Sequence, residues 1–116
     1  MQQDKVFAIR FSSLYPVYLK KVVSKGRTQD ELDRVLGWLT GYDAAGLQQQ
    51  CKGGQDLAAF FARAPAFTAA ADRITGMVCG VRVETIEHPL MRKIRQMDKL
   101  VDELAKDRPL DKILRA

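Results

Sequence analysis

Residues 89–106 read PLMRKIRQMDKLVDELAK. Apolar side chains recur there at spacings of four, three, four and three, at Leu90, Ile94, Met97, Val101 and Leu104. This is a heptad pattern, and Pro89 suits the first position of a helix. The stretch therefore predicts a helix with a narrow apolar seam that packs against another helix. The seam lies either in the chain's own core or against a second copy in a homodimer formed through helix 89–106.

Length and composition favour one folded domain. The chain has 116 residues, of which 47% are hydrophobic, enough to bury a core without metals or disulfides. The helical patterns along it predict a mainly α fold, a compact helical bundle of about five to six helices over residues 1–116. We expect no metal and no cofactor, because the single histidine and the two cysteines form no known ligand spacing.

The cellular location of the protein is inferred from features that the sequence lacks. Charged residues interrupt the first eleven positions, and no apolar run approaches the roughly 18 residues that span a bilayer. Cys51 and Cys79 lie in unrelated contexts, which fits a reducing compartment. We expect a soluble, cytoplasmic protein with no membrane partner.

Several helix boundaries can be assigned from capping residues. Thr28 and Glu31 form a capping box, and Gly41 has the position of a left-handed C-terminal cap. Asp43 then caps a shorter helix that runs to about Cys51.

The segments around this pair of helices have weaker signals. Ser12 or Ser13 is the expected cap of a first helix that Gly26 ends. Asp56 opens a short helix before Pro65, and Thr68 begins a further one.

The segment after Gly76 is ambiguous. Gly76 and Gly80 are four residues apart, a spacing that lets two helices approach closely, and this favours a helix over residues 77–83. The alternative is a short β pair of residues 6–11 with 77–83, because Phe7, Ile9 and Phe11 alternate as in a half-buried strand.

Long strings of the sequence resemble a bacterial family, domain of unknown function 2200. They are SSLYPVYLKKVVSKGRT, VLGWLTGY, FFARAP and residues 76–115, and the most specific parts are WLTGY at 38–42 and CGVRVE at 79–84. The resemblance implies no activity, cofactor or partner. One position departs from the family pattern, since His88 stands before Pro89 where the family usually has an acidic residue. We expect His88 to cap the following helix.

Five residues are candidates for binding a ligand or a partner. Trp38 and Tyr42 flank the turn after one helix and are expected either to form a pocket wall with Arg82 or to pack in the core. The second candidate set forms either a basic surface around the helix 89–106 or an ordinary solvated helix face, and consists of Arg82, Arg92, Lys93, Arg95 and Lys99. The function we expect is a small binding or protein-interaction domain, with self-association as one form of it.

Two other classes of function remain open. The net charge of +5 and a helix-turn-helix over residues 28–52 would suit a nucleic-acid-binding protein, although its second helix, AAGLQQQCK, carries three glutamines and a single cation. An enzyme would use Cys79 as nucleophile with Arg82 and Glu84, but a buried, inert Cys79 is the simpler expectation. The sequence contains neither a P-loop nor a nucleophile elbow.

Overall fold

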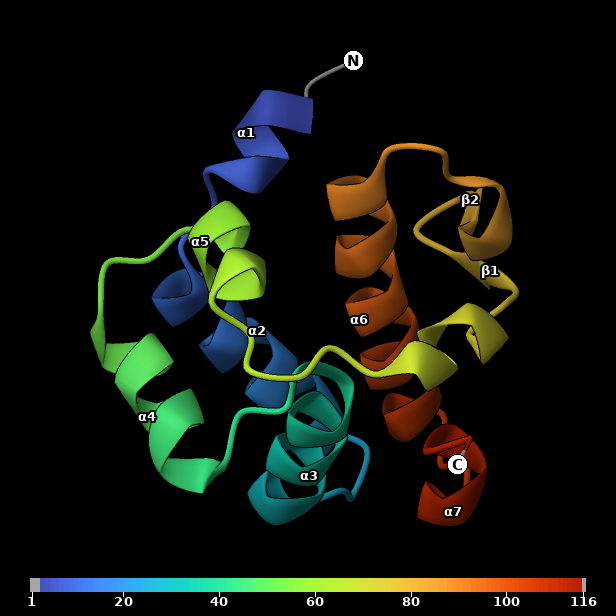
Figure 1. Cartoon of the computed structure of the whole chain (residues 1–116). Coiled ribbons are helices and arrows are strands. Elements are labelled where there is room, and N and C mark those ends of the chain that lie inside the picture. The colour runs from blue at the N-terminus through green and yellow to red at the C-terminus, as the bar shows by residue number, and fades with distance from the viewer. Residues whose placement is uncertain (1–2, 116) are drawn as a thin grey trace.

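The helix predicted from the heptad pattern is the central element of the fold. In the computed structural model, which describes residues 3–115, it is α6 (Pro89–Ala105), and other elements surround it (Figure 1). It contacts α1, α2, α3, α5, α7, the strand β1 and the 3-10 turn η2. In chain order the elements are α1 (Gln3–Phe7), α2 (Phe11–Val23), α3 (Gln29–Thr40), α4 (Ala44–Lys52), α5 (Leu57–Ala62), η1 (Ala69–Arg73), β1 (Met77–Val78), β2 (Val81–Arg82), η2 (Val83–Thr85), α6 and α7 (Leu110–Ile113).

The apolar seam of α6 packs inside its own chain. Met97, Val101 and Leu104 are completely buried, and Ile94 is 2% exposed. They belong to one core cluster with side chains of α2, α3, α5 and α7. Burying such side chains contributes about 1.5–3 kcal/mol each, so α6 anchors the bundle. Self-association of the folded chain would have to use a different face of the molecule.

The predicted capping residues are where the helices begin and end. Thr28 and Glu31 form both hydrogen bonds of the capping box, and Asp43 caps α4 through the amide of Gly46. Gly41 has a φ of 83°, and a Cβ there would lie 2.5 Å from the amide nitrogen of Ala66, so only glycine fits.

Other boundaries differ from the prediction. The first long helix begins at Phe11, before Ser12 and Ser13, and its N-cap residue Arg10 makes no side-chain capping bond. Thr68 does cap the following segment, but that segment is the 3-10 turn η1 and not an α-helix. Asp56 caps α5 as predicted, by accepting a hydrogen bond from Ala59.

The predicted β pair of residues 6–11 with 77–83 is wrong. Val6 and Phe7 belong to α1, and Phe11 already begins α2. The short extended link between them pairs instead with the residues before α5, through an isolated bridge of Arg10 with Asp56. The alternation of aromatic and aliphatic residues here reflects the end of one helix and the start of the next.

The helix favoured over residues 77–83 is wrong as well. β1 and β2 form an antiparallel hairpin with Met77 opposite Arg82 and Val78 opposite Val81. Its turn is Cys79-Gly80, with φ angles of 51° and 79°. Positive φ at both central residues is the geometry of the tight turn that matches the twist of a hairpin, and a right-handed helix cannot contain it. Gly80 therefore serves a turn and not a helix contact.

Two tyrosines of α2 hold the neighbouring helices. The hydroxyl of Tyr15 donates to Asp33 of α3, and that of Tyr18 donates to Asp98 of α6. Both rings are buried, each with 6% of its surface exposed. Burial and the neighbouring Asp98 carboxylate raise the pKa of Tyr18 well above its usual value of 10.0. These bonds fix α2 against both partners with a direction that apolar packing alone lacks.

No helix among residues 3–115 has the length and apolar composition needed to cross a membrane.

Truncation of a seam residue tests whether the seam lies in the chain's own core. We expect Met97→Ala to lower the free energy of unfolding by about 2–5 kcal/mol, because it leaves a cavity in a closed core. Urea unfolding followed by the fluorescence of Trp38, the single tryptophan, measures this. Val17→Ala is the control, since Val17 is 61% exposed on α2. A loss of stability in Met97→Ala no larger than in Val17→Ala would contradict a seam that is buried in the chain's own core.

Alkaline pH tests the tyrosine contacts. Because the folded state raises the pKa of Tyr18, the unfolded chain releases this proton first, so the contribution of Tyr18 to stability is fully present below pH 10.0 and is lost progressively above it. One such group accounts for up to about 1.4 kcal/mol per pH unit. We expect Tyr18→Phe to lose stability less steeply than the original chain between pH 10 and pH 11.5, in urea titrations. Equal slopes would contradict the assignment.

Candidate functional site

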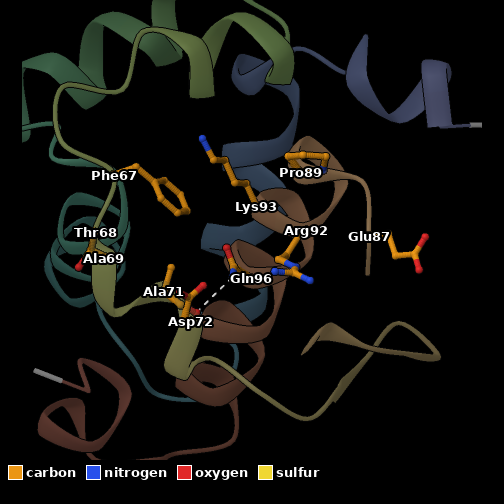
Figure 2. A pocket seen from close by; sticks show the side chains of 10 residues that line it. All are labelled: Phe67, Thr68, Ala69, Ala71, Asp72, Glu87, Pro89, Arg92, Lys93 and Gln96. Atoms are coloured by element: carbon orange, nitrogen blue, oxygen red, sulfur yellow. Dashed lines mark hydrogen bonds between the residues drawn. The ribbon is translucent and has the colours of Figure 1, made fainter. Parts of the chain in front are cut away.

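A cleft of about 350 Å³ lies between η1 and the first half of α6 (Figure 2). Pro89, at the start of α6, lies at one end of the cleft. Phe67, in the segment before η1, lies on the wall opposite α6. The lining residues are Phe67, Thr68, Ala69, Ala71, Asp72, Glu87, Pro89, Arg92, Lys93 and Gln96. The cleft thus combines an aromatic surface, a helix with two adjacent cations and a short polar turn.

Arg92 and Lys93 supply the positive charge of the cleft. The Nε atom of Arg92 donates to the carbonyl of Ile86 at 2.8 Å, which fixes the guanidinium at the base of the 85–89 loop. In the part of the chain that the structure describes, neither cation lies within 4.0 Å of a carboxylate oxygen. Lys93 instead places its ammonium 4.7 Å from the ring centroid of Phe67. Both cations thus have capacity for an anionic group.

Gln96 joins the two walls of the cleft. Its Nε2 donates to the carbonyl of Ala71 in η1 at 3.1 Å, and only 3% of the residue is exposed. Figure 2 shows this bond, with Asp72 beside it. A buried amide that is hydrogen-bonded fixes its surroundings, so the 3-10 turn is held at a set distance from α6.

A second hollow, of about 220 Å³, continues the cleft. It shares Asp72, Arg92 and Gln96 with the first and adds Ile74 and Glu84. The amide of Gly76 donates to Glu84 at 2.9 Å, and this bond is the main cause of the lowered pKa of that carboxyl. Glu84 is thus an anion that the hairpin already holds, whereas Figure 2 shows Glu87 directed away from the other lining side chains.

The basic residues of α6 that were predicted to share one surface divide among three places. Arg92 and Lys93 face the cleft, whereas Arg95 forms an ion pair with Asp98 at 3.0 Å, next to Tyr18. Lys99 donates to the carbonyl of Met77 at 3.1 Å and so supports the hairpin. A continuous basic surface along α6 is therefore not formed.

Trp38, Tyr42 and Arg82 do not come together. Tyr42 is 8% exposed, and its hydroxyl donates to the carbonyl of Phe60 at 2.7 Å. Trp38 is half-buried and packs against the core from α3. Arg82 lies on β2 and pairs with Glu84 at 3.5 Å, on the other side of the bundle from α4 (Figure 1). Trp38 and Tyr42 therefore pack against or within the core, which was the alternative to their forming a pocket wall.

The residues proposed for an enzyme do not form a catalytic arrangement. Cys79 is exposed at the hairpin turn, so the expectation of a buried cysteine is wrong. Glu84 is held by Gly76 and Arg82, and no described hydrogen bond joins it to Cys79. Within residues 5–115 no three His, Cys, Asp or Glu side chains gather at metal-binding distance.

The helix pair predicted over residues 28–52 is present, as α3 and α4. Its second helix has less polar surface than the sequence suggests, because Gln50 is only 7% exposed and its Oε1 is buried. Gln48, Gln49 and Lys52 remain exposed. Two glutamines and one cation offer little contact with phosphates, which dominate the affinity of nucleic-acid complexes.

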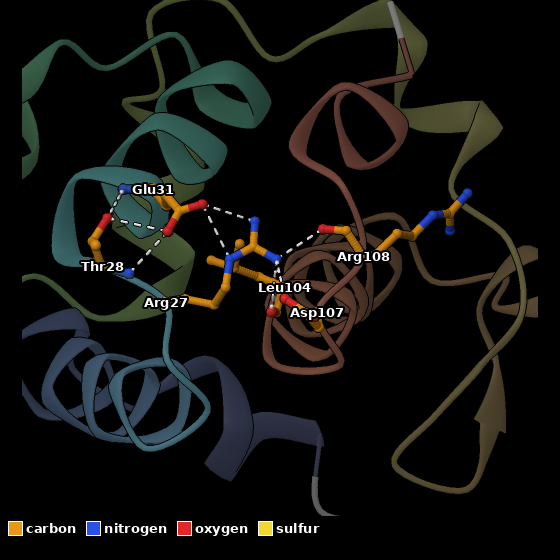
Figure 3. A network of polar contacts seen from close by, with 6 residues as sticks. All are labelled: Arg27, Thr28, Glu31, Leu104, Asp107 and Arg108. Carbon is orange, nitrogen blue, oxygen red and sulfur yellow. Dashed lines mark hydrogen bonds and ion pairs between the residues drawn. The ribbon is translucent and has the colours of Figure 1, made fainter.

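A second polar cluster, at the far end of α6, has a structural role (Figure 3). The side chain of Arg27 is 9% exposed, pairs with Glu31 at 2.8 Å and donates to the carbonyl of Arg108 at 2.8 Å. Cations are favourable near the last carbonyls of a helix. Arg27 therefore ties the α2–α3 link to the end of α6, and its donors are already engaged.

Phe67, Asp72 and Gln96 were not predicted as site residues. Phe67 and Asp72 lie outside any motif and approach α6 only in the folded chain. Gln96 gave no signal either, because it lies one residue before the seam residue Met97, at a helix position that the heptad pattern leaves to solvent.

The architecture defines a small helical domain with a two-stranded hairpin packed on its central helix. The chain belongs to the DUF2200 family, described as an uncharacterized protein conserved in bacteria, whose model matches residues 5–115. It is also similar to a solved structure, the crystal structure of uncharacterized protein SP1917, with 37% identity and a TM-score of 0.91 over 98% of this chain and 93% of that one. No match was found among curated proteins.

Proposed function

We propose that this protein is a small binding domain whose site is the cleft between η1 and α6. The observation that carries the proposal is the state of Arg92. Its guanidinium is fixed by Ile86, borders both hollows and has no carboxylate within ion-pair distance among the described residues. A partly buried cation with no carboxylate within ion-pair distance is costly to the folded chain, and a bound anionic group would offset that cost.

The other features of the cleft support a binding role. Its volume of about 350 Å³ lies within the usual range for ligand sites, and apolar and aromatic surfaces accompany a few polar groups. The Gln96 bond to Ala71 fixes the two walls relative to each other before a ligand binds, so little order has to be gained on binding. Because no nucleophile and general base come together at the cleft, its chemistry favours recognition over catalysis.

Mapping of small probes by NMR tests where the binding site lies. Benzoate, benzylammonium and benzyl alcohol are titrated separately into the ¹⁵N-labelled protein, and amide shifts are followed. We expect the largest shifts at Ala71, Lys93 and Gln96, because these residues line the cleft.

Two variants make this test specific. Phe67→Ala removes the aromatic wall and should reduce the shifts, whereas Met77→Ala, at a side chain 50% exposed on the hairpin, should leave them unchanged. Shifts that gather on α3 and α4, or no saturable shifts with any probe, would contradict the proposed site.

A further inference from the structure

The two hollows beside Arg92 form one groove. They share Asp72, Arg92 and Gln96, so Arg92 lies where the larger hollow, about 350 Å³, meets the smaller one, about 220 Å³. Asp72 and Pro89 at its margins are exposed, so the groove is open to solvent. A pocket for a free metabolite usually buries most of its ligand. An open groove of this kind fits the end of a longer molecule.

The charges of the groove face each other with opposite sign. Arg92 and Lys93 stand on α6, and Asp72 stands on η1, beside the bond that joins the two elements. A ligand that satisfies both walls needs an anion and an N–H donor close together, with an apolar group toward Phe67. The last residue of a polypeptide has all three, namely its α-carboxylate, its amide N–H and its side chain.

The same charges disfavour a phosphate. Asp72 and Glu84 line the smaller hollow, and the hairpin holds Glu84 in its ionised form. A dianionic group at Arg92 would share the smaller hollow with both carboxylates, and like charges in one site repel. A single carboxylate is the anion that the pair of cations can accept.

We propose that the groove binds the C-terminal residue of a partner polypeptide, with its α-carboxylate at Arg92 and Lys93, its amide N–H at Asp72 and an apolar side chain against Phe67. This inference rests on the proposed function, because it names the ligand of the same cleft. Capture of a terminal carboxylate is a known mode of peptide recognition.

Isothermal titration with three probes tests the chemistry. They are N-acetyl-Ala-Phe with a free carboxylate, the same dipeptide as its C-terminal amide, and free phenylalanine. We expect the free-carboxylate dipeptide to bind about tenfold more tightly than the amide, because the amide loses charge-assisted hydrogen bonds to Arg92. It should also bind more tightly than free phenylalanine.

Matched variants connect the binding to the named residues. Arg92→Gln should reduce the preference for the carboxylate, with Lys93 left as the remaining cation, while Arg34→Gln, the same change at an exposed position of α3, should leave it intact. Asp72→Asn, on the exposed face of η1, should weaken binding of the dipeptide by a few fold. The fluorescence of Trp38 verifies that each variant is folded.

The following outcomes would contradict either this inference or the proposed function. Equal binding of the carboxylate and amide dipeptides, or an unchanged preference in Arg92→Gln, would overturn the inference. Tighter binding of free phenylalanine would overturn it in favour of a free amino acid and leave the proposed function standing. If the NMR shifts caused by benzoate, benzylammonium and benzyl alcohol lie outside the cleft, the proposed function itself would be overturned.

Discussion

Packing of the α6 seam against α2 and α3 is the interaction on which the rest of the structure depends. Met97 and Val101 are completely buried in it, and Tyr18 adds a hydrogen bond to Asp98 of the same helix. Because the seam faces the core, the two flanks of α6 contact other elements. Gln96 donates a hydrogen bond to η1, and Lys99 donates one to the hairpin. The cleft is a consequence of that arrangement, because α6 supplies one wall and holds the other.

The fold around this helix was largely predictable where a local physical signal exists. The capping box at Thr28 and the glycine at position 41 fix their helix ends through hydrogen bonds or backbone angles that involve only a few residues. The hairpin was not predictable from spacing alone, because Gly80 could serve either a helix contact or a tight turn. Its positive φ, together with that of Cys79, decides for the turn, and this depends on packing against α6.

The candidate site was predictable only in part. Arg92 was named because it lies on a basic flank of the heptad helix, and the structure places it in the cleft. Phe67 and Asp72 could not be named, since they come from a segment without a motif that reaches α6 through tertiary contacts. Arg95 was also named as a site residue, but its charge is matched by Asp98, three residues later on the same helix. A basic residue type thus indicates a site only when the fold leaves the charge without a partner.

Under the proposed function, the protein is a recognition domain built on one long helix, with its core on one face and its binding cleft on another. The most direct test is a crystal structure with N-acetyl-Ala-Phe bound. We expect the ligand carboxylate within hydrogen-bonding distance of the Arg92 guanidinium and the phenylalanine ring of the ligand against Phe67. Ligand density at the hairpin, or on α3 and α4 with an empty cleft, would contradict it.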